Sequence, residues 1–356
     1  MLSLIRIILS PLTFVYTFLI KARNYFFDKK IFKVTKVKAL VLSVGNITVG
    51  GSGKTPTVIF LAQLLKKFGR RTGILSRGYG RTSSGYLFVS DGSNVKTTVD
   101  ECGDEMFLVS NETKLPSAVS ERRVEGAHRL IGDAGVDSII LDDAFQHRWI
   151  YRDLDIVLID QSFLCKYGSV DQRMLPLGLM REPFSSFLRA NVIIINRKFS
   201  GKQPIPVNLV EYFNNKNVFY GYYSEKGIFD VKTHNEFKVE EFQGQKSLLV
   251  CGIARPHSFF NVLEKNKIDV TNKMIFTDHK NYTVKEVKSI RKQFYDTNAY
   301  SVLTTQKDAV KLNKFKKELD DIDIYYLKIE LKLEEQERFE ELIKNLVTSS
   351  QNEEAA

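Results

Sequence analysis

A glycine-rich segment, residues 45–57, ends in Gly53-Lys54-Thr55 and constrains the fold more than any other stretch of the chain. The apolar run 39–44 precedes it and is typical of a buried strand, and apolar residues at helical spacing follow it from Ile59 to Leu65. A glycine-rich turn between a strand and a helix brings backbone N–H groups onto phosphate oxygens, and the helix N-terminus adds partial positive charge. The segment therefore predicts a nucleotide-binding P-loop, in which Lys54 reaches the β- and γ-phosphates and Thr55 holds Mg²⁺.

One position departs from the general P-loop pattern G-x-x-x-x-G-K-[ST], because Thr48 stands where the pattern has glycine. Gly45, Gly50 and Gly51 are close enough in sequence to supply the turn. The alternative is an ordinary βα loop that binds nothing, but the Gly-Lys-Thr triplet between a strand and a helix favours a nucleotide. The residues expected to bind it are Gly50, Gly51, Ser52, Gly53, Lys54, Thr55 and Pro56.

Composition sets the broad class of protein. With 356 residues the chain is long enough for two domains, and 43% hydrophobic residues can fill a core in both. Three widely spaced cysteines argue against a disulfide scaffold and against a zinc site. The net charge of +10 suits an anionic partner, which by charge alone is a nucleic acid, a lipid surface or a phosphorylated substrate.

The N-terminus narrows that choice. Residues 7–20 are mostly apolar, carry aromatic side chains that include Tyr16 and Phe18, and are flanked by Arg6, Lys21 and Arg23. A helix of this length spans about 21 Å, which is less than the ~30 Å of a bilayer core, and Pro11 interrupts it. A secretory signal peptide would need a cleavage site of small residues, which the residues after this stretch do not provide. We expect residues 1–30 to form a helix that lies on an anionic membrane surface, with a helix packed on the core as the alternative.

Two pairs of carboxylates are candidates for the nucleotide site. The apolar run 138–141 ends in Asp142-Asp143, and such residues at the carboxyl edge of a parallel sheet lie beside the P-loop, where they bind Mg²⁺ directly or through water. The second pair, Asp104-Glu105, belongs to a predicted helix, where acidic residues also stabilise the helix dipole. The candidate metal ligands are Thr55, Glu105, Asp142 and Asp143.

Alternating strands and helices predict an α/β fold. We expect a P-loop NTPase-like, doubly wound sheet over residues 31–215, a linker of two paired strands (218–223 and 237–242) within 216–246, and a smaller α/β domain over 247–356. Residues 331–347 are expected to form an amphipathic helix of that smaller domain.

A phosphoryl-transfer enzyme also needs a group that accepts the proton of the attacking hydroxyl. The candidates by residue type are Asp104, Glu105, His147 and His279, because a carboxylate that is hydrogen-bonded to a histidine makes an effective base. Asp278-His279 follows an apolar stretch of the second domain and would face a cleft between the domains. A histidine at a strand end is more often structural, so the residues alone leave the base unassigned.

Several segments, taken in order along the chain, resemble the tetraacyldisaccharide 4′-kinase family of lipid A biosynthesis, and they span residues 45–310. The P-loop variant with Thr48 and Pro56 is itself similar to that family. The other segments are Ser76-Arg77-Gly78-Tyr79-Gly80-Arg81, Gly103-Asp104-Glu105, Leu141-Asp142-Asp143-Ala144-Phe145-Gln146-His147, Leu175-Pro176-Leu177-Gly178 with Arg181-Glu182-Pro183, Phe276-Thr277-Asp278-His279 and Lys307-Asp308-Ala309-Val310.

The resemblance implies ATP- and Mg²⁺-dependent transfer of a γ-phosphoryl group to the 4′-hydroxyl of a lipid A disaccharide 1-phosphate, at the cytoplasmic face of a Gram-negative inner membrane. It implies that Asp104 acts as base with His279, that Lys54 contacts phosphate, and that Arg181 contacts substrate or phosphate. The chain departs from the family pattern where Ala144, Met180 and Asn281 replace the expected glycine, leucine and histidine.

Other function classes remain as alternatives. A membrane-associated nucleotide switch or a metallochaperone also uses a P-loop, although Thr305-Gln306-Lys307-Asp308 misplaces the lysine of the guanine-binding motif and no Cys or His cluster suits a metal carrier. A nucleic-acid-dependent ATPase rests on net charge alone. We expect the lipid disaccharide and an anionic membrane surface as partners, no nucleic acid, and a monomer.

Overall fold

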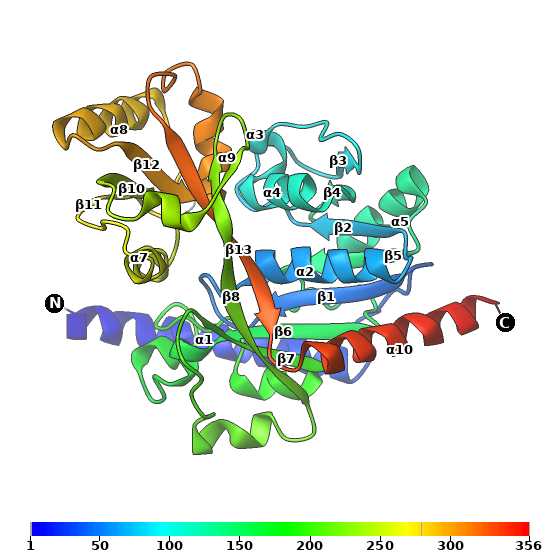
Figure 1. Ribbon diagram of the computed structural model, residues 1–356. Coiled ribbons are helices and arrows are strands. Elements are labelled where there is room, and N and C mark those ends of the chain that lie inside the picture. The colour runs from blue at the N-terminus through cyan, green and yellow to red at the C-terminus, as the bar shows by residue number, and fades with distance from the viewer. Residues whose placement is uncertain (1, 279, 356) are drawn as a thin grey trace.

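The computed structural model describes residues 2–278 and 280–355, with side chains for residues 10–278 and 280–352. Within these residues thirteen strands form one continuous sheet of order β11-β10-β12-β13-β8-β7-β6-β1-β5-β2-β4-β3, and β9 pairs with β8 (Figure 1). The sheet bends between two units that face each other across a cleft. The P-loop NTPase-like α/β fold expected from the sequence is thereby confirmed.

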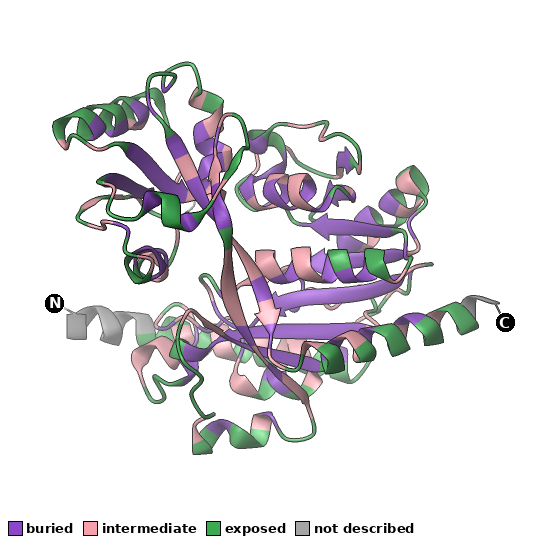
Figure 2. Ribbon diagram, viewed as in Figure 1, coloured by how far each residue is buried: buried purple, intermediate pink, exposed green. Residues whose placement is uncertain are grey.

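The first unit contains the P-loop. Its strands are parallel except β3, and the central ones are buried along their whole length, which explains their unbroken apolar sequences (Figure 2). Its elements are β1 (Leu40–Asn46), α2 (Lys54–Lys67), β2 (Thr72–Ser76), β3 (Leu87–Asp91), α3 (Val99–Cys102), α4 (Asp104–Thr113), β4 (Pro116–Val119), α5 (Arg123–Ala134), β5 (Ser138–Asp142), β6 (Leu154–Asp160), α6 (Gln161–Leu164) and β7 (Val192–Lys198).

Helices cover both faces of this part of the sheet. Leu42 of β1 points to the face covered by α2, where it joins the cluster of Leu61, whereas Val41 points to the opposite face and packs with Leu130 of α5. This alternation is the period of two that a strand imposes on its side chains. The P-loop between β1 and α2 is therefore anchored in two hydrophobic clusters.

The second unit repeats the α/β arrangement on a smaller scale. Helix α7 packs on one face of its sheet through Phe259 and Phe260, and α8 and α9 pack on the other through Ile290 and Leu312. Its elements are β9 (Glu236–Phe237), β10 (Ser247–Cys251), α7 (Pro256–Lys265), β11 (Asn272–Ile275), α8 (Val284–Asp296), β12 (Ser301–Thr305) and α9 (Gln306–Leu312).

Two long strands connect the units, and they are not the pair that the sequence predicted. Strand β8 (Asn217–Asp230) pairs with β7 at its start and then runs antiparallel to β13 (Ile324–Leu333). Of the expected partner, residues 237–242, only Phe237 pairs with β8, and residues 239–242 form a 3₁₀-helix. Lys328, Glu330 and Lys332 of β13 alternate with apolar residues, which is the period of a strand and not of the helix expected from residue 331.

The C-terminal helix α10 (Gln336–Ala355) packs on the first unit and not on the second. Phe339 is fully buried, and its ring lies 5.8 Å from that of Phe60 in α2 and 5.2 Å from that of Phe219 in β8. The last helix of the expected domain 247–356 therefore belongs to the first unit, because β13 returns the chain across the cleft before α10 begins.

The N-terminal helix α1 (Leu2–Asp28) lies along the first unit. Tyr16 and Ile20 pack against the cluster of β6 and β7, whereas Phe14 and Phe18 on the outer side are 75% and 64% exposed. In the described part of the chain, no helix combines the length and the apolar character that crossing a membrane requires.

Candidate active site in the cleft between the units

A cavity of about 620 Å³ lies between the two units, at the carboxyl ends of β1 and β5. The first unit lines it with the P-loop, residues 49–56, and with Glu105, Asp143 and Arg181. The second unit contributes Asp278 and Lys307, and residues 327–332 of β13 close one side. A cleft of this kind, at the carboxyl edge of a parallel sheet, is the usual place for a nucleotide in α/β proteins.

The P-loop is held in shape by buried polar contacts. Gly53 has a φ of 101°, and a Cβ there would come within 2.2 Å of Asn196 Nδ2. That amide donates to the carbonyl oxygen of Ser52 (3.0 Å), and Asn46 Nδ2 donates to Ser52 Oγ (2.9 Å). The loop therefore requires glycine at position 53, as a phosphate cradle does.

Thr48 fits this loop without glycine. Its backbone bridges to Met180, Val49 N donates to the carbonyl of Leu179 (2.8 Å), and Arg181 N donates to the carbonyl of Ile47 (2.8 Å). Residues 47–49 are thus extended, and the positive φ angles of the loop fall on Gly50 and Gly53. The same pairing brings Arg181 to the P-loop.

Asp142 and Asp143 end β5 beside Lys54. Lys54 Nζ lies 3.7 Å from Asp143 Oδ1, and Arg181 donates to both oxygens of that carboxylate at 3.0 Å. Burial alone would raise the pKa of Asp143, but the charges of Lys54 and Arg181 hold it below its ordinary value. Asp143 is therefore a carboxylate at neutral pH.

Asp142 is the more deeply buried of the two and suits a divalent cation. It accepts a hydrogen bond from Ser76 Oγ (3.2 Å) through one oxygen, and its Oδ1 has no hydrogen-bond partner among the described residues. Burial, together with the negative charges of Glu105 and Asp143, raises the pKa of Asp142 to about 7. A cation bound at this oxygen would offset both the burial of the charge and the repulsion from Glu105 and Asp143, so the residues fit Mg²⁺.

No three side chains of the His, Cys, Asp and Glu types are arranged to hold a metal in the described ranges. In P-loop enzymes, Mg²⁺ is bound by a Ser or Thr hydroxyl and one acidic residue, and phosphate oxygens and water supply the other ligands. Thr55, the residue that the sequence predicts to supply that hydroxyl, lies on α2 and lines the cavity.

Asp104 opens α4 directly after Gly103, whose φ is 87°. A Cβ on Gly103 would lie 2.8 Å from the carbonyl oxygen of Tyr79, so the loop 76–81 packs on the turn that presents Asp104. Asp104 is 8% exposed, and the neighbouring Glu105 lines the cavity.

Two lysines of α9 reach Asp104 and Glu105 from the second unit, and the sequence prediction missed them. Lys307 Nζ lies 3.1 Å from Glu105 Oε1 and 4.0 Å from Asp104 Oδ2, and Lys311 Nζ lies 3.4 Å from Asp104 Oδ2. The segment that begins Lys307-Asp308 is part of the family resemblance, but the sequence alone indicates no role for its lysine. Its fully buried Asp308 accepts from Gly252 N (2.9 Å) and from Thr305 Oγ1 (2.7 Å), which fixes α9 at the cleft.

Of the two histidine candidates, only His147 belongs to the described residues. His279, the expected partner of Asp104, lies outside the described residues, and the strand before it ends at Ile275. His147 is not among the residues that line the cavity, and its ring lies 5.4 Å from that of Trp149. Burial and nearby arginines lower the pKa of His147 to about 4, so it is uncharged at neutral pH.

Comparison with known proteins gives one consistent result. A family model described as Tetraacyldisaccharide-1-P 4′-kinase (LpxK) matches residues 5–348. The tetraacyldisaccharide 4′-kinase of Halothermothrix orenii is 35% identical over 93% of this chain and 90% of its own, and that of Aquifex aeolicus is 33% identical over 96% and 98%. A crystal structure of LpxK from Aquifex aeolicus in complex with ATP has a TM-score of 0.76 and 31% identity, and the match covers 96% of this chain and 99% of that chain.

Proposed function

The chain belongs to the tetraacyldisaccharide 4′-kinase family, and we propose that it transfers the γ-phosphoryl group of ATP to the 4′-hydroxyl of a lipid A disaccharide 1-phosphate. The observation that carries the proposal is the convergence, on one cleft, of a P-loop, of Asp143 beside its lysine, and of Glu105, whose neighbour Asp104 contacts Lys311 of the second unit. Phosphoryl transfer needs these parts and little covalent chemistry from the protein.

Residues of the first unit would hold the nucleotide. Backbone N–H groups of residues 50–56 and the N-terminus of α2 suit the phosphates, and Lys54 suits the β- and γ-phosphates. Mg²⁺, held by Thr55 and by Asp142 or Asp143 with Glu105 nearby, would neutralise charge on the phosphates. Arg181, which already contacts Asp143, is positioned to stabilise charge that develops on the transferred group.

Asp104 is the proposed base. Its carboxylate, which lies 3.4 Å from Lys311 Nζ and 4.0 Å from Lys307 Nζ, would accept the proton of the 4′-hydroxyl as that oxygen attacks phosphorus. His279 is proposed to assist it, on the strength of the family resemblance. Because the proposed base pair, Asp104 and His279, comes from the two predicted domains, closure of the cleft would complete the site and exclude water.

The lipid acceptor is proposed to reach this site from a membrane surface. The outer side of α1 exposes Phe14, Phe18 and Leu19; the basic residue Lys21 follows on the same helix, and Lys29 comes directly after its end. An apolar face with adjacent lysines suits the surface of an anionic bilayer, here the cytoplasmic face of the inner membrane.

The test is transfer of label from γ-labelled ATP to a tetraacyl disaccharide 1-phosphate in mixed micelles. We expect a labelled lipid with the natural acceptor and none with an acceptor that lacks the 4′-hydroxyl. Slow ATP hydrolysis that is indifferent to the lipid would instead indicate a nucleotide switch, and stimulation by polynucleotide would indicate a nucleic-acid-dependent ATPase. Either outcome would overturn the proposal.

A further inference from the structure

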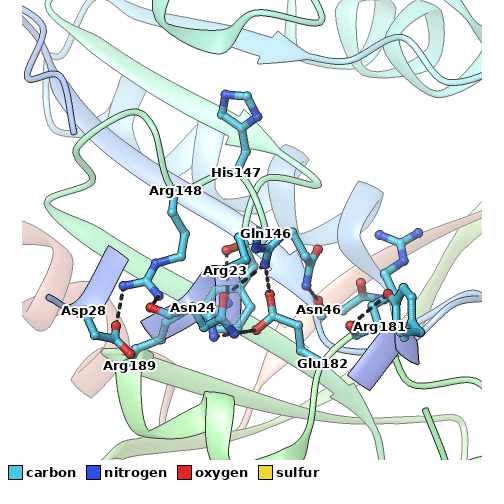
Figure 3. Close-up of polar contacts among 12 residues, drawn as sticks. Arg23, Asn24, Asp28, Asn46, Gln146, His147, Arg148, Arg181, Glu182 and Arg189 are labelled. Atoms are coloured by element: carbon cyan, nitrogen blue, oxygen red, sulfur yellow. Dashed lines mark hydrogen bonds and ion pairs between the residues drawn. The ribbon is translucent and has the colours of Figure 1, made fainter. Parts of the chain in front are cut away.

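A buried carboxylate, that of Glu182, joins the N-terminal helix α1 to the segments that surround Asp143. Glu182 is 0% exposed, and its side chain is bound by Arg23 NH2 at 2.8 Å, Arg189 NH1 at 2.6 Å and Asn24 Nδ2 at 3.2 Å. Figure 3 shows Arg23 and Asn24 of α1, and Arg189 from the segment that follows Glu182, converging on the Glu182 side chain. Two cations from segments far apart in sequence therefore share one anion.

Glu182 is connected to the proposed metal carboxylates in two ways, through Arg189 and through Arg181. Arg189 donates to the carbonyl oxygen of Phe145 (3.2 Å), and its guanidinium lies 3.6 Å from the centre of the Phe145 ring, two residues after Asp143. On the other side, Glu182 directly follows Arg181, which holds Asp143. The carbonyl of Arg181 in turn accepts from Tyr16 of α1 (3.0 Å).

The energetics make this cluster act as a unit. A buried carboxylate is tolerated when it is paired and hydrogen-bonded, and removal of one partner leaves an uncompensated charge. Burial alone would raise the pKa of Glu182, but Arg189, Ser186 and Arg23 hold it below its ordinary value, so the residue is ionised. Its neutralisation would leave Arg23 and Arg189 without their shared anion and would release α1 and the loop after β5 together.

We propose that Glu182 is a positioning residue for the proposed kinase reaction, because it couples the seating of α1 to the placement of Arg181 and Asp143 beside Lys54. The inference rests on the proposed function for its link to phosphoryl transfer. The helix that is proposed to meet the membrane thus also orders the loop that carries the metal ligands. The side chain of Glu182 is linked to the metal carboxylates through Arg181 and Phe145, so we expect its loss to affect turnover more strongly than nucleotide affinity.

The test compares Glu182→Gln with Asp28→Asn. Asp28 also joins α1 to the loop after β5, through Arg148 at 2.7 Å, but its side chain is 62% exposed, so it is a matched control outside the buried cluster. For Glu182→Gln we expect kcat to fall about tenfold to a hundredfold, with the Kd for ATP changed less than about threefold. Asp28→Asn is expected to keep the wild-type kcat.

Two further measurements separate positioning from a loss of fold. Hydrogen–deuterium exchange of Glu182→Gln, measured without lipid or nucleotide, should show faster exchange in both residues 143–148 and residues 181–189. Arg23→Met should lower kcat as Glu182→Gln does, and Arg23→Lys should restore part of it; this pair serves if Glu182→Gln does not fold. Wild-type kcat per folded molecule in Glu182→Gln and Arg23→Met, or unchanged exchange in both segments, would overturn the inference.

The outcomes also distinguish the two proposals. If the wild type forms labelled lipid and Glu182→Gln matches it, the positioning role fails and the kinase assignment stands. If the wild type forms none, the kinase assignment fails, and the exchange experiment still decides whether Glu182 couples α1 to the loop after β5.

Discussion

Lys311 Nζ lies 3.4 Å from Asp104 Oδ2, although Lys311 belongs to the second unit of the sheet and Asp104 to the first. The Lys311 side chain is 3% exposed, and its ammonium also lies 3.5 Å from Asp308 Oδ1. A lysine so deeply buried is stabilised by the two carboxylates on either side of it. The contact therefore fixes the proposed base only when the two units are together.

Replacing this lysine is expected to impair turnover. In Lys311→Met, Asp104 loses the cation that orients its carboxylate, and kcat should fall about tenfold to a hundredfold as the base becomes misplaced. Lys314→Met is the control, because Lys314 also crosses between the units, to Asp100 at 2.5 Å, but at the surface. Steady-state kinetics should leave this control near wild type, and an equal loss in both variants would contradict the role given to Lys311.

Gly53→Ala is expected to abolish ATP binding. The φ of 101° strains any residue with a Cβ, and that atom would meet Asn196 Nδ2 at 2.2 Å and Tyr223 Oη at 2.6 Å. Isothermal titration with ATP and Mg²⁺ should show no binding, while Gly132→Ala, in a helix position where a Cβ meets nothing within 4 Å, should bind normally. Normal affinity in Gly53→Ala would show that this loop does not cradle the phosphates.

His147 should make the stability of the protein sensitive to acid. Burial, followed by the charges of Arg123 and Arg152, lowers its pKa to about 4 in the folded state, against 6.5 for a free side chain. Between these values the unfolded chain binds a proton that the folded chain does not, so the free energy of unfolding falls as the pH is lowered through this window. Urea unfolding at pH 7.5 and 5.0 should show a smaller drop for His147→Gln, and an equal drop in both proteins would contradict the assignment.

Phe339→Ala should destabilise the P-loop unit. The ring is fully buried between Phe60 and Phe219, and truncation of such a side chain costs about 3–5 kcal/mol of unfolding free energy. Tyr300→Ala removes a ring that is 73% exposed and should cost no more than about 0.5 kcal/mol. Chemical denaturation followed by circular dichroism measures both, and similar losses would mean that α10 does not stabilise this core.

The sequence predicted the parts of the site that are local in the chain. The P-loop, the Asp142-Asp143 pair and the Asp104-Glu105 pair each consist of adjacent residues at an element boundary, so motif and periodicity suffice to find them. The alternation of Lys328, Glu330 and Lys332 is that of a strand, but the predicted helix starts at residue 331, inside β13.

Contacts between distant segments could not be predicted in this way. Arg23 and Glu182 are 159 positions apart, and Lys307 and Glu105 are 202 apart, and nothing in either local sequence names its partner. Such pairs depend on how β8 and β13 fold the second unit over the first. The fold class was therefore accessible from the sequence, whereas the charges that organise the cleft required the three-dimensional arrangement.

The most direct measurement is transfer of the γ-phosphoryl group to a tetraacyl disaccharide 1-phosphate, comparing the wild type with Asp104→Asn at saturating ATP. The account predicts labelled lipid from the wild type and a loss of about a hundredfold or more in kcat for the variant, because an amide cannot accept the proton. ATP affinity should be similar in both. Equal turnover would remove Asp104 from the role of base, and no labelled lipid from a folded, ATP-binding wild type would contradict the kinase assignment itself.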